Sequence, residues 1–372
     1  MSDFAPIARV ETWVVQYPVV GTFKYTAAAT RDTVVVRLTD ADGCQGWGQS
    51  VPSRTWSYET TETVRTTIDL YLGPLLIGCD PGDGDRIWSA MNRAIAASYS
   101  TGQPIAKAGI DLALFDLTGR RLGQSPAQRW GRPERDTVTL SWTLDPAHPG
   151  DVAPAIEAAH GRGFRHFNVK VGTDAGLDLE VCREIRRHAP EAFVWVDANG
   201  GYDLETALAL APRFADLGIA ALEQPLPANR LTGYRRLREI GALPILMDEG
   251  VVSLADLEEF HRLGLLDGVA MKVSRCGGLT EARRIVEYLL EHGLHFFASG
   301  LTDPDLSLAA SLHLFAAYGL SHPAALNAPQ FLDGSILARP IVVAGDQATV
   351  PAGPGLGVEV LERGGGGAEW AV

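Results

Sequence analysis

Five charged residues recur along the second half of the chain at a nearly constant interval. They are Lys170, Asp197, Glu223, Asp248 and Lys272, separated by 27, 26, 25 and 24 residues. One strand–loop–helix–loop unit of a parallel barrel uses a segment of about that length. One such residue per unit, each at the end of a strand, would bring all five side chains to one mouth of the barrel. The spacing therefore predicts a repeated βα architecture with a single polar site.

The residues before the three acids support this placement at strand ends. Each acid follows a short, unbroken apolar run of the kind found in parallel strands buried on both faces. These runs are Phe193 to Val196, Ile219 to Leu222 and Pro244 to Met247. In the run 167–171, alternation with period two places Asn168 and Lys170 on the same side of the strand.

From about Thr137 the pattern alternates between strands and helices. Further strands are expected at 138–143, 167–171, 268–271, 294–298 and 324–327, which with the three acid-bearing strands makes eight. Helices are expected near 151–160, 177–188, 203–216, 230–240, 253–264, 279–292 and 305–318. Eight alternating units favour a closed barrel over an open sheet.

The first 135 residues have a different pattern. Two strands are expected at 7–17 and 33–38, a turn at Gly46-Trp47-Gly48, and helices over 57–72 and 85–123. The end of the chain is rich in glycine and proline and predicts turns with one edge strand at 358–360. This N-terminal α+β segment carries no catalytic pattern of its own.

Composition excludes several classes of partner. With 372 residues the chain is long enough for two domains, and its net charge of −13 disfavours a broad surface for nucleic acid or an anionic membrane. The four cysteines form no CxxC pair, so neither a disulfide framework nor a zinc site is indicated. No basic leader precedes an apolar stretch, and no run reaches the ~18 apolar residues of a membrane helix. We therefore expect a cytoplasmic protein without nucleic-acid or membrane partners.

The ordered motifs resemble the muconate-lactonizing branch of the enolase superfamily, within the mandelate racemase and muconate lactonizing enzyme family. The resemblance rests on Asn168-x-Lys170, Asp197-Ala198-Asn199-Gly200-Gly201, Glu223-Gln224-Pro225, Asp248-Glu249 and Lys272-x-x-x-x-Gly277-Gly278. It implies an α/β fold, a modified (β/α) TIM-type barrel with an N-terminal α+β capping domain completed by the C-terminal tail. The implied boundaries are 1–135 for the capping domain, 136–330 for the barrel and 331–372 for the segment that returns to the capping domain.

The resemblance also implies the chemistry. Members bind Mg²⁺ through three strand-end acids, which match Asp197, Glu223 and Asp248, and Mn²⁺ is a possible substitute. Lysines matching Lys170 and Lys272 move the proton next to the substrate carboxylate. A cation suits this task because the enediolate product gathers negative charge on two carboxylate oxygens. Mg²⁺ prefers such hard oxygen ligands and leaves positions free for substrate.

Three positions qualify the resemblance. Asn168 stands where this branch commonly has the first lysine of Lys-x-Lys, so a charge that would lower the pKa of Lys170 is missing. Gln49 follows Gly-Trp-Gly where relatives often carry an acid, which suggests altered specificity. The histidine that mandelate-racemase-like members place after strand seven has no counterpart in 298–302, and His295 is interpreted as a core residue.

Substrate contacts are expected from two capping loops and from the loop after strand seven. The candidates are Tyr25 in 19–29, Trp56 in 49–58, Asn168, Thr302, and Asp305, which could meet a substrate ammonium or cap the next helix. Aromatic side chains in the capping loops suggest a compact, partly apolar substrate. The segments 300–305 and 326–331 are similar to members acting on hydroxyproline and related cyclic amino acids.

We therefore expect a Mg²⁺-dependent dehydratase, racemase or epimerase of a small proline-type amino acid such as cis-3-hydroxy-L-proline. A muconate-type cycloisomerase is the alternative within the class. Outside it stand a lyase forming a Schiff base through Lys170 or Lys272, and a carboxylate-binding protein without activity. The family also implies a homo-oligomer acting on a small carboxylate substrate.

Overall fold

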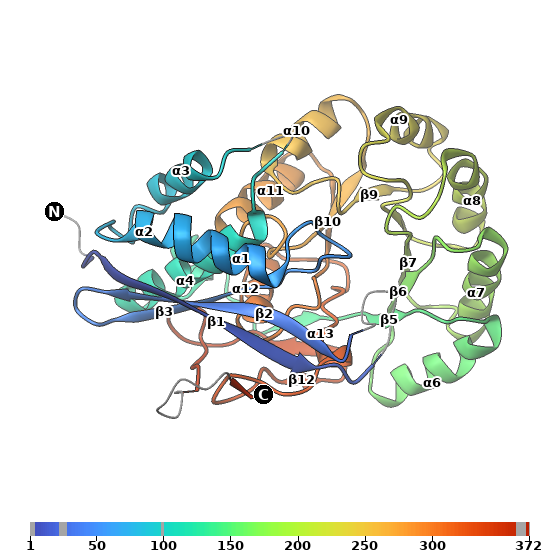
Figure 1. Ribbon diagram of the computed structural model, residues 1–372. Helices are drawn as coiled ribbons and strands as arrows, with labels where there is room; N and C mark the ends of the chain where they lie inside the picture. Colours follow the sequence, from blue (N-terminus) through green and yellow to red (C-terminus); the bar gives the residue numbers. More distant parts are fainter. Residues whose placement is uncertain (1–3, 22–27, 98–99, 362–369, 372) are drawn as a thin grey trace.

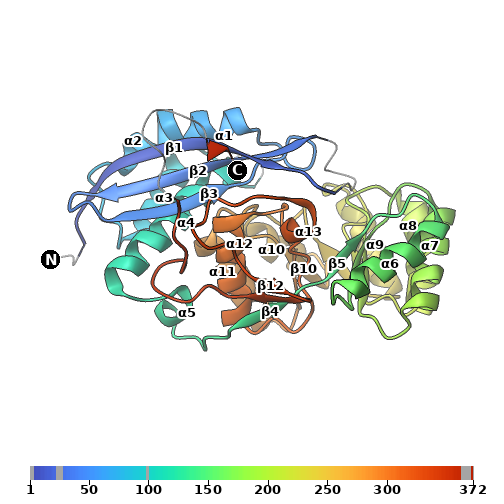
Figure 2. The same ribbon diagram turned by 90° about the horizontal axis from the view of Figure 1, so that it is seen from below.

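The computed structural model describes residues 4–21, 28–97, 100–361 and 370–371. Their strands form a four-stranded sheet near the N-terminus, a curled seven-stranded parallel sheet and a small three-stranded sheet. Figures 1 and 2 show the N-terminal sheet lying across the barrel, with helices α6 to α9 along the barrel's outer side. No helix among the described residues is both long and apolar enough to cross a membrane.

The N-terminal sheet is antiparallel except at one edge. Its order is β14-β1-β2-β3, with bounds Trp370–Ala371, Ile7–Pro18, Thr30–Asp40 and Gln45–Ser50. The backbone of β14 pairs in parallel with β1, so the end of the chain returns to the sheet in which it began. The helical elements of this part are α1 Thr61–Thr67, the π-helix η1 Ile68–Leu72, α2 Gly73–Leu76, α3 Gly84–Ala94, α4 Pro104–Leu122 and α5 Pro126–Arg129.

The segment 46–48 forms part of strand β3, and the expected turn there is wrong. Strand β3 lies directly on helix α4. A Cβ atom on Gly48 would come 2.0 Å from the carbonyl oxygen of Gly109, and one on Gly46 would come 2.3 Å from that of Ala113. Only glycine permits this approach, so these glycines serve close packing of strand on helix.

The parallel sheet follows the predicted order of units. Its strands are β5 Trp142–Leu144, β6 Phe167–Lys170, β7 Val194–Asp197, β8 Leu222–Glu223, β9 Ile245–Met247, β10 Gly268–Met271 and β11 His295–Ala298. The helices between and after them are α6 Val152–Gly161, α7 Ala175–His188, α8 Leu204–Asp216, α9 Leu231–Ile240, α10 Leu254–Arg262, α11 Leu279–Glu291 and α12 Asp305–Ala317. The 3₁₀ turn η2 Pro149–Asp151 precedes α6, and the short helix α13 Ala328–Phe331 follows α12. Each helix expected in the barrel is present within a few residues, whereas the helix expected over 85–123 is divided into α3 and α4.

The barrel closes through a reduced eighth unit. The expected strand at 324–327 makes only two bridges, Leu140 with Ala324 and Ser299 with Ala325. The expected strand at 138–143 divides into β5 and β4 Thr137–Thr139, and β4 pairs with β13 Gln347–Thr349, which pairs with β12 Val343–Ala344. The described sheet therefore has seven regular strands, and one distorted connection completes the ring.

An apolar layer fills the barrel below the strand ends. Its members are buried residues that point inward, one from each of six neighbouring segments: Trp195, Ala221, Leu246, Ala270, Phe297 and Ala325. Because side chains alternate along a strand, the residue two positions later points inward one layer higher. From the first four segments those residues are Asp197, Glu223, Asp248 and Lys272. Folding of the barrel interior thus aligns four of the five spaced residues.

Candidate active site

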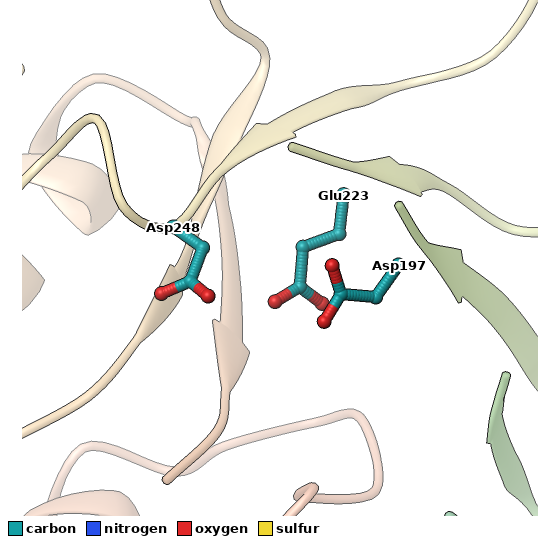
Figure 3. A group of neighbouring side chains, drawn as sticks. All are labelled: Asp197, Glu223 and Asp248. Carbon is teal, nitrogen blue, oxygen red and sulfur yellow. The ribbon is translucent and has the colours of Figure 1, made fainter. Parts of the chain in front are cut away.

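Three carboxylates converge above this apolar layer. Asp197 and Glu223 are the last residues of β7 and β8, and Asp248 directly follows β9. Each is no more than 1% exposed, and one oxygen from each lies within 4.8 Å of the others. Figure 3 shows the three carboxyl groups pointing into a common space. The sequence prediction that these acids meet is confirmed as geometry.

Two lysines flank the acids from opposite sides of the cluster. Lys170, the last residue of β6, places its Nζ 2.6 Å from Asp197 Oδ2. Lys272, which follows β10, places its Nζ 2.5 Å from Asp248 Oδ2 and 3.7 Å from Glu223 Oε1. Three strands separate β6 from β10 in the sheet. The two amines therefore approach the cluster from different directions.

The electrostatics of the cluster are those of charges removed from water. Burial first and the neighbouring Asp197 second raise the pKa of Glu223 to about 8, although Lys272 and Lys170 lower it in part. Burial alone would lower the pKa of Lys170, but the three acids, Asp197 first, outweigh it and raise that pKa. The neighbouring acids thus favour the protonated form of Lys170.

Two supporting residues were missed in the sequence. Trp195 donates its indole N–H to Glu223 Oε2 at 2.8 Å and so orients that acid. Arg275 is 3% exposed, and its guanidinium forms an ion pair with Oδ1 of Asp248. Burial tends to raise the pKa of Asp248, but Arg275 and then Lys272 lower it overall. Trp195 could have been identified from its position two residues before Asp197, whereas nothing local distinguished Arg275.

Trp56 covers the site from the N-terminal domain. Its ring centre lies 5.5 Å from Lys170 Nζ, 5.1 Å from Lys272 Nζ and 5.4 Å from the Arg275 guanidinium carbon. Its indole N–H donates to Glu249 Oε1 at 2.8 Å. The ring is 8% exposed, so it screens the amines from water. Trp56 therefore lies beside both amines, and its predicted contact with substrate stays a prediction.

The other predicted substrate contacts have different surroundings. Asn168 is 1% exposed, on the same face of β6 as Lys170, and its Nδ2 has no hydrogen-bond partner among the described residues. Thr302 is buried in the loop after β11 with φ +61°. Tyr25 lies outside the described residues. Asn168 is therefore available to a ligand, and contacts from Thr302 and Tyr25 stay predictions.

Asp305 is bound within the protein. It accepts hydrogen bonds from Tyr17 Oη at 2.7 Å, Ser335 Oγ at 2.6 Å and the Ile336 backbone N–H at 2.9 Å. Gln49 belongs to the same contact, because its side-chain N–H group donates to Tyr17 Oη at 3.1 Å. These bonds join the N-terminal sheet to the barrel. Asp305 and Gln49 thus have structural partners, and a role in contacting substrate is not needed to explain them.

His295 differs from its sequence interpretation as a core residue. It is exposed and begins β11, whereas the site lies at the other end of the strands. The first residue of a strand is at the rim of the sheet, which the apolar pattern alone did not show. Its position leaves Lys170 and Lys272 as the candidate bases.

The acid cluster fits a divalent cation. Glu223 Oε1 is buried and has no hydrogen-bond partner among the described residues, and all three acids offer hard oxygen ligands. Three buried carboxylates with this spacing repel one another unless positive charge lies between them. The lysines supply part of that charge. Oxygen-only ligands favour Mg²⁺ or Mn²⁺ over softer metals.

Comparison with known proteins agrees with this geometry. Residues 7–131 match the N-terminal domain of the mandelate racemase and muconate lactonizing enzyme family, and residues 151–364 match the enolase C-terminal domain-like family. A chloromuconate cycloisomerase from Cupriavidus necator is 32% identical over 342 residues, which cover 90% of this chain and 91% of the relative.

Solved structures show the same fold. The crystal structure of 2-chloromuconate cycloisomerase from Rhodococcus opacus 1CP superposes with a TM-score of 0.87 at 28% identity, covering 95% of this chain and 96% of that one. An N-succinyl Arg/Lys racemase from Bacillus cereus ATCC 14579 gives 0.88 at 23% identity over 96% of each chain, which shows likeness of fold alone. With its strand-end acids, paired lysines and matches over both domains, the chain belongs to the enolase superfamily, in its muconate-lactonizing branch.

Proposed function

We propose that the protein is a Mg²⁺-dependent enzyme that moves the proton next to a substrate carboxylate through an enediolate. The observation that carries this proposal is the placement of Lys170 and Lys272 against Asp197 and Asp248 at 2.6 and 2.5 Å. Enolase-superfamily sites are an established case of a lysine or histidine base beside Mg²⁺. The ion, held by Asp197, Glu223 and Asp248, would supply positive charge for the developing enediolate.

The protein's own residues would perform the proton transfers. With a cation between the acids, the negative charge that holds the proton on Lys170 is compensated, so the amine can serve as a base. Lysines that approach the cluster from different directions can act on opposite faces of one carbon. Removal by one and return by the other gives racemisation or epimerisation. Delivery of a proton to a departing hydroxyl gives dehydration.

For the substrate we retain a proline-type amino acid, such as cis-3-hydroxy-L-proline, as the first candidate. A compact site screened by Trp56 supports a small ring with apolar edges. The second candidate is muconate-type cycloisomerisation, favoured by the curated relatives, among them the chloromuconate cycloisomerase of Cupriavidus necator. Asp305 lends the first candidate no support, since its oxygens are bound by Tyr17, Ser335 and Ile336.

Incubation in D₂O with Mg²⁺ tests the chemistry directly. A panel of proline derivatives, N-acyl amino acids and unsaturated diacids would be followed by proton NMR for exchange and product. We expect exchange or turnover with one class, and a loss of about 10³-fold or more in Lys170→Met or Lys272→Met. If a variant still exchanges one enantiomer and has lost exchange of the other, the lysine that was replaced acts on the enantiomer whose exchange is lost.

Controls separate the remaining alternatives. Full activity in EDTA with borohydride labelling of Lys170 or Lys272 would contradict the proposal and favour a Schiff-base lyase. Binding of a carboxylate without exchange or turnover would indicate a protein that lost activity. A homo-oligomeric state and a cytoplasmic location stay predictions of the sequence and family, to be measured by light scattering and by cell fractionation.

A further inference from the structure

A second cavity lies beside the acid site, between the two domains. Its volume is about 480 Å³. One wall comes from the N-terminal part, chiefly Tyr58 and the described residues between Ile95 and Gln103, and the other from the barrel segments 228–229 and 249–260. The proposed chemistry requires no occupant here, so the cavity needs its own explanation. Its size is within the range of sites for small organic ligands.

Two acceptor oxygens of the residues that line this cavity lack a donor among the described residues. Glu249 uses its Oε1 to accept from Trp56 Nε1 at 2.8 Å and Asn199 Nδ2 at 3.1 Å. Its Oε2 is buried and has no hydrogen-bond partner among the described residues. The Oε1 atom of Gln103 is in the same state. Buried acceptors without a donor cost free energy, so two such oxygens at one cavity indicate that a donor is missing.

The charge of the lining has one sign. Among the described residues around the cavity, Glu249 and Asp256 are acids, and no lysine or arginine is present. Asp256 already accepts from Ser253 Oγ at 2.8 Å, while Glu249 retains its second oxygen. The remaining wall is mainly apolar and aromatic and includes Val252 and Phe260. The ligand that suits this lining carries several donors, a positive charge and an apolar stem.

We propose that this cavity binds an organic cation, a primary ammonium or a guanidinium on a short alkyl stem. An ammonium has three donors and no acceptor, and it can serve both Glu249 Oε2 and Gln103 Oε1. A neutral alcohol offers one donor and no charge. A carboxylate offers none and would face Glu249 with the same charge. The cation can belong to the far end of a substrate or to a separate ligand.

Calorimetry on the full chain with saturating Mg²⁺ tests this site without requiring catalysis. Pentylammonium and butylguanidinium are the probes, and 1-pentanol and pentanoate are the matched neutral and anionic controls. We expect the cations to bind at least about tenfold more tightly than 1-pentanol. Ala228→Phe, which fills the cavity, should abolish this binding, whereas Ala158→Phe on the exposed face of α6 should leave it unchanged.

Gln103→Leu should weaken cation binding several-fold and leave 1-pentanol binding unaltered, because it removes one acceptor at similar volume. Equal affinity for pentylammonium and 1-pentanol, or cation binding that survives Ala228→Phe, would overturn the proposal. Cation binding that is seen only when Mg²⁺ is left out would do the same, since the amine would then occupy the acid cluster.

Kinetics distinguish the two sources of the cation. In the D₂O exchange assay, pentylammonium should raise KM at constant kcat if the cavity holds the far end of the substrate. A change in kcat at constant KM would indicate a separate ligand. If no compound in the panel exchanges, the proposed function fails while the calorimetric result stands, so the two failures are distinguishable.

Discussion

The indole N–H of Trp56 donates a 2.8 Å hydrogen bond to Glu249, the residue next to Asp248 of the acid cluster. Trp56 and Glu249 are 193 positions apart and belong to different domains. The same ring lies about equally far from Lys170 and Lys272, at 5.5 and 5.1 Å. The contact that joins the N-terminal domain to the barrel therefore also places the ring over both amines.

Replacement of Trp56 should separate the two roles of its ring. Trp56→Phe keeps an aromatic face over the lysines and removes the N–H to Glu249, while Trp56→Ala removes both. A cation–π contact of this kind contributes about 0.5–2 kcal/mol, so we expect roughly a tenfold loss in kcat/KM for Ala beyond that for Phe. Trp13→Phe, in the N-terminal sheet beside Trp47, is the matched control. Equal losses for Phe and Ala would show that the ring face contributes nothing.

Asn168→Lys should restore the charge that the branch commonly places beside the inner lysine. A like charge disfavours protonation of its neighbour, so the pKa of Lys170 in the Mg²⁺-loaded enzyme should fall by about one unit. The acidic limb of the rate profile should move to lower pH by that amount. Asn168→Met controls for loss of the amide. An unchanged profile would mean that the cation alone tunes Lys170.

Asp305→Asn should destabilise the protein without altering substrate choice. The carboxylate now accepts from donors such as the Ile336 backbone N–H. The amide of the variant would point its own N–H at one of these donors, so two donors would face each other. A buried mismatch of this kind costs about 1–3 kcal/mol, measurable as a lower urea midpoint. The ratio of activities on an amino acid and its deaminated analogue should stay constant. A collapse of that ratio would instead assign Asp305 to a substrate ammonium.

His313 should make the protein sensitive to acid. Burial lowers its pKa to about 4, although the bond to the Leu356 carbonyl opposes this slightly. The unfolded chain therefore binds the proton first, near the ordinary value of ~6.5. Stability is complete above that pH and is lost as pH falls toward 4, by about 3 kcal/mol in all.

His313→Gln tests this dependence, because glutamine does not titrate. The free energy of unfolding, measured by urea denaturation from pH 4 to 7, should depend less on pH in this variant than in the wild type. His295→Gln, at the exposed start of β11, should retain the slope. Identical slopes for wild type and His313→Gln would contradict the assignment.

The sequence predicted the acid cluster because the feature was periodic. In parallel strands the residues at the carboxyl ends lie at one edge, so Asp197, Glu223 and Asp248 could be brought together without knowledge of any other contact. The same regularity predicted the helices. Strand β3 was not predicted because its glycines resemble those of a turn. Only the close approach of α4 explains why glycine is needed there.

Contacts between distant segments could not be predicted in this way. The bond from Trp56 to Glu249 and the one from Tyr17 to Asp305 join elements whose relative position depends on docking of whole domains. Arg275 lies in the turn after Lys272, where sequence gives no direction for the side chain. The eighth strand was predicted from an ordinary apolar run, which does not show that its partners reach it through two single bridges.

The most direct measurement of the central claim is anomalous diffraction from crystals soaked in Mn²⁺. One ion should lie within about 2.0–2.3 Å of an oxygen of each of Asp197, Glu223 and Asp248, with the Lys170 and Lys272 amines directed toward the space above it. An ion bound elsewhere, or amines turned away from this space, would contradict the claim.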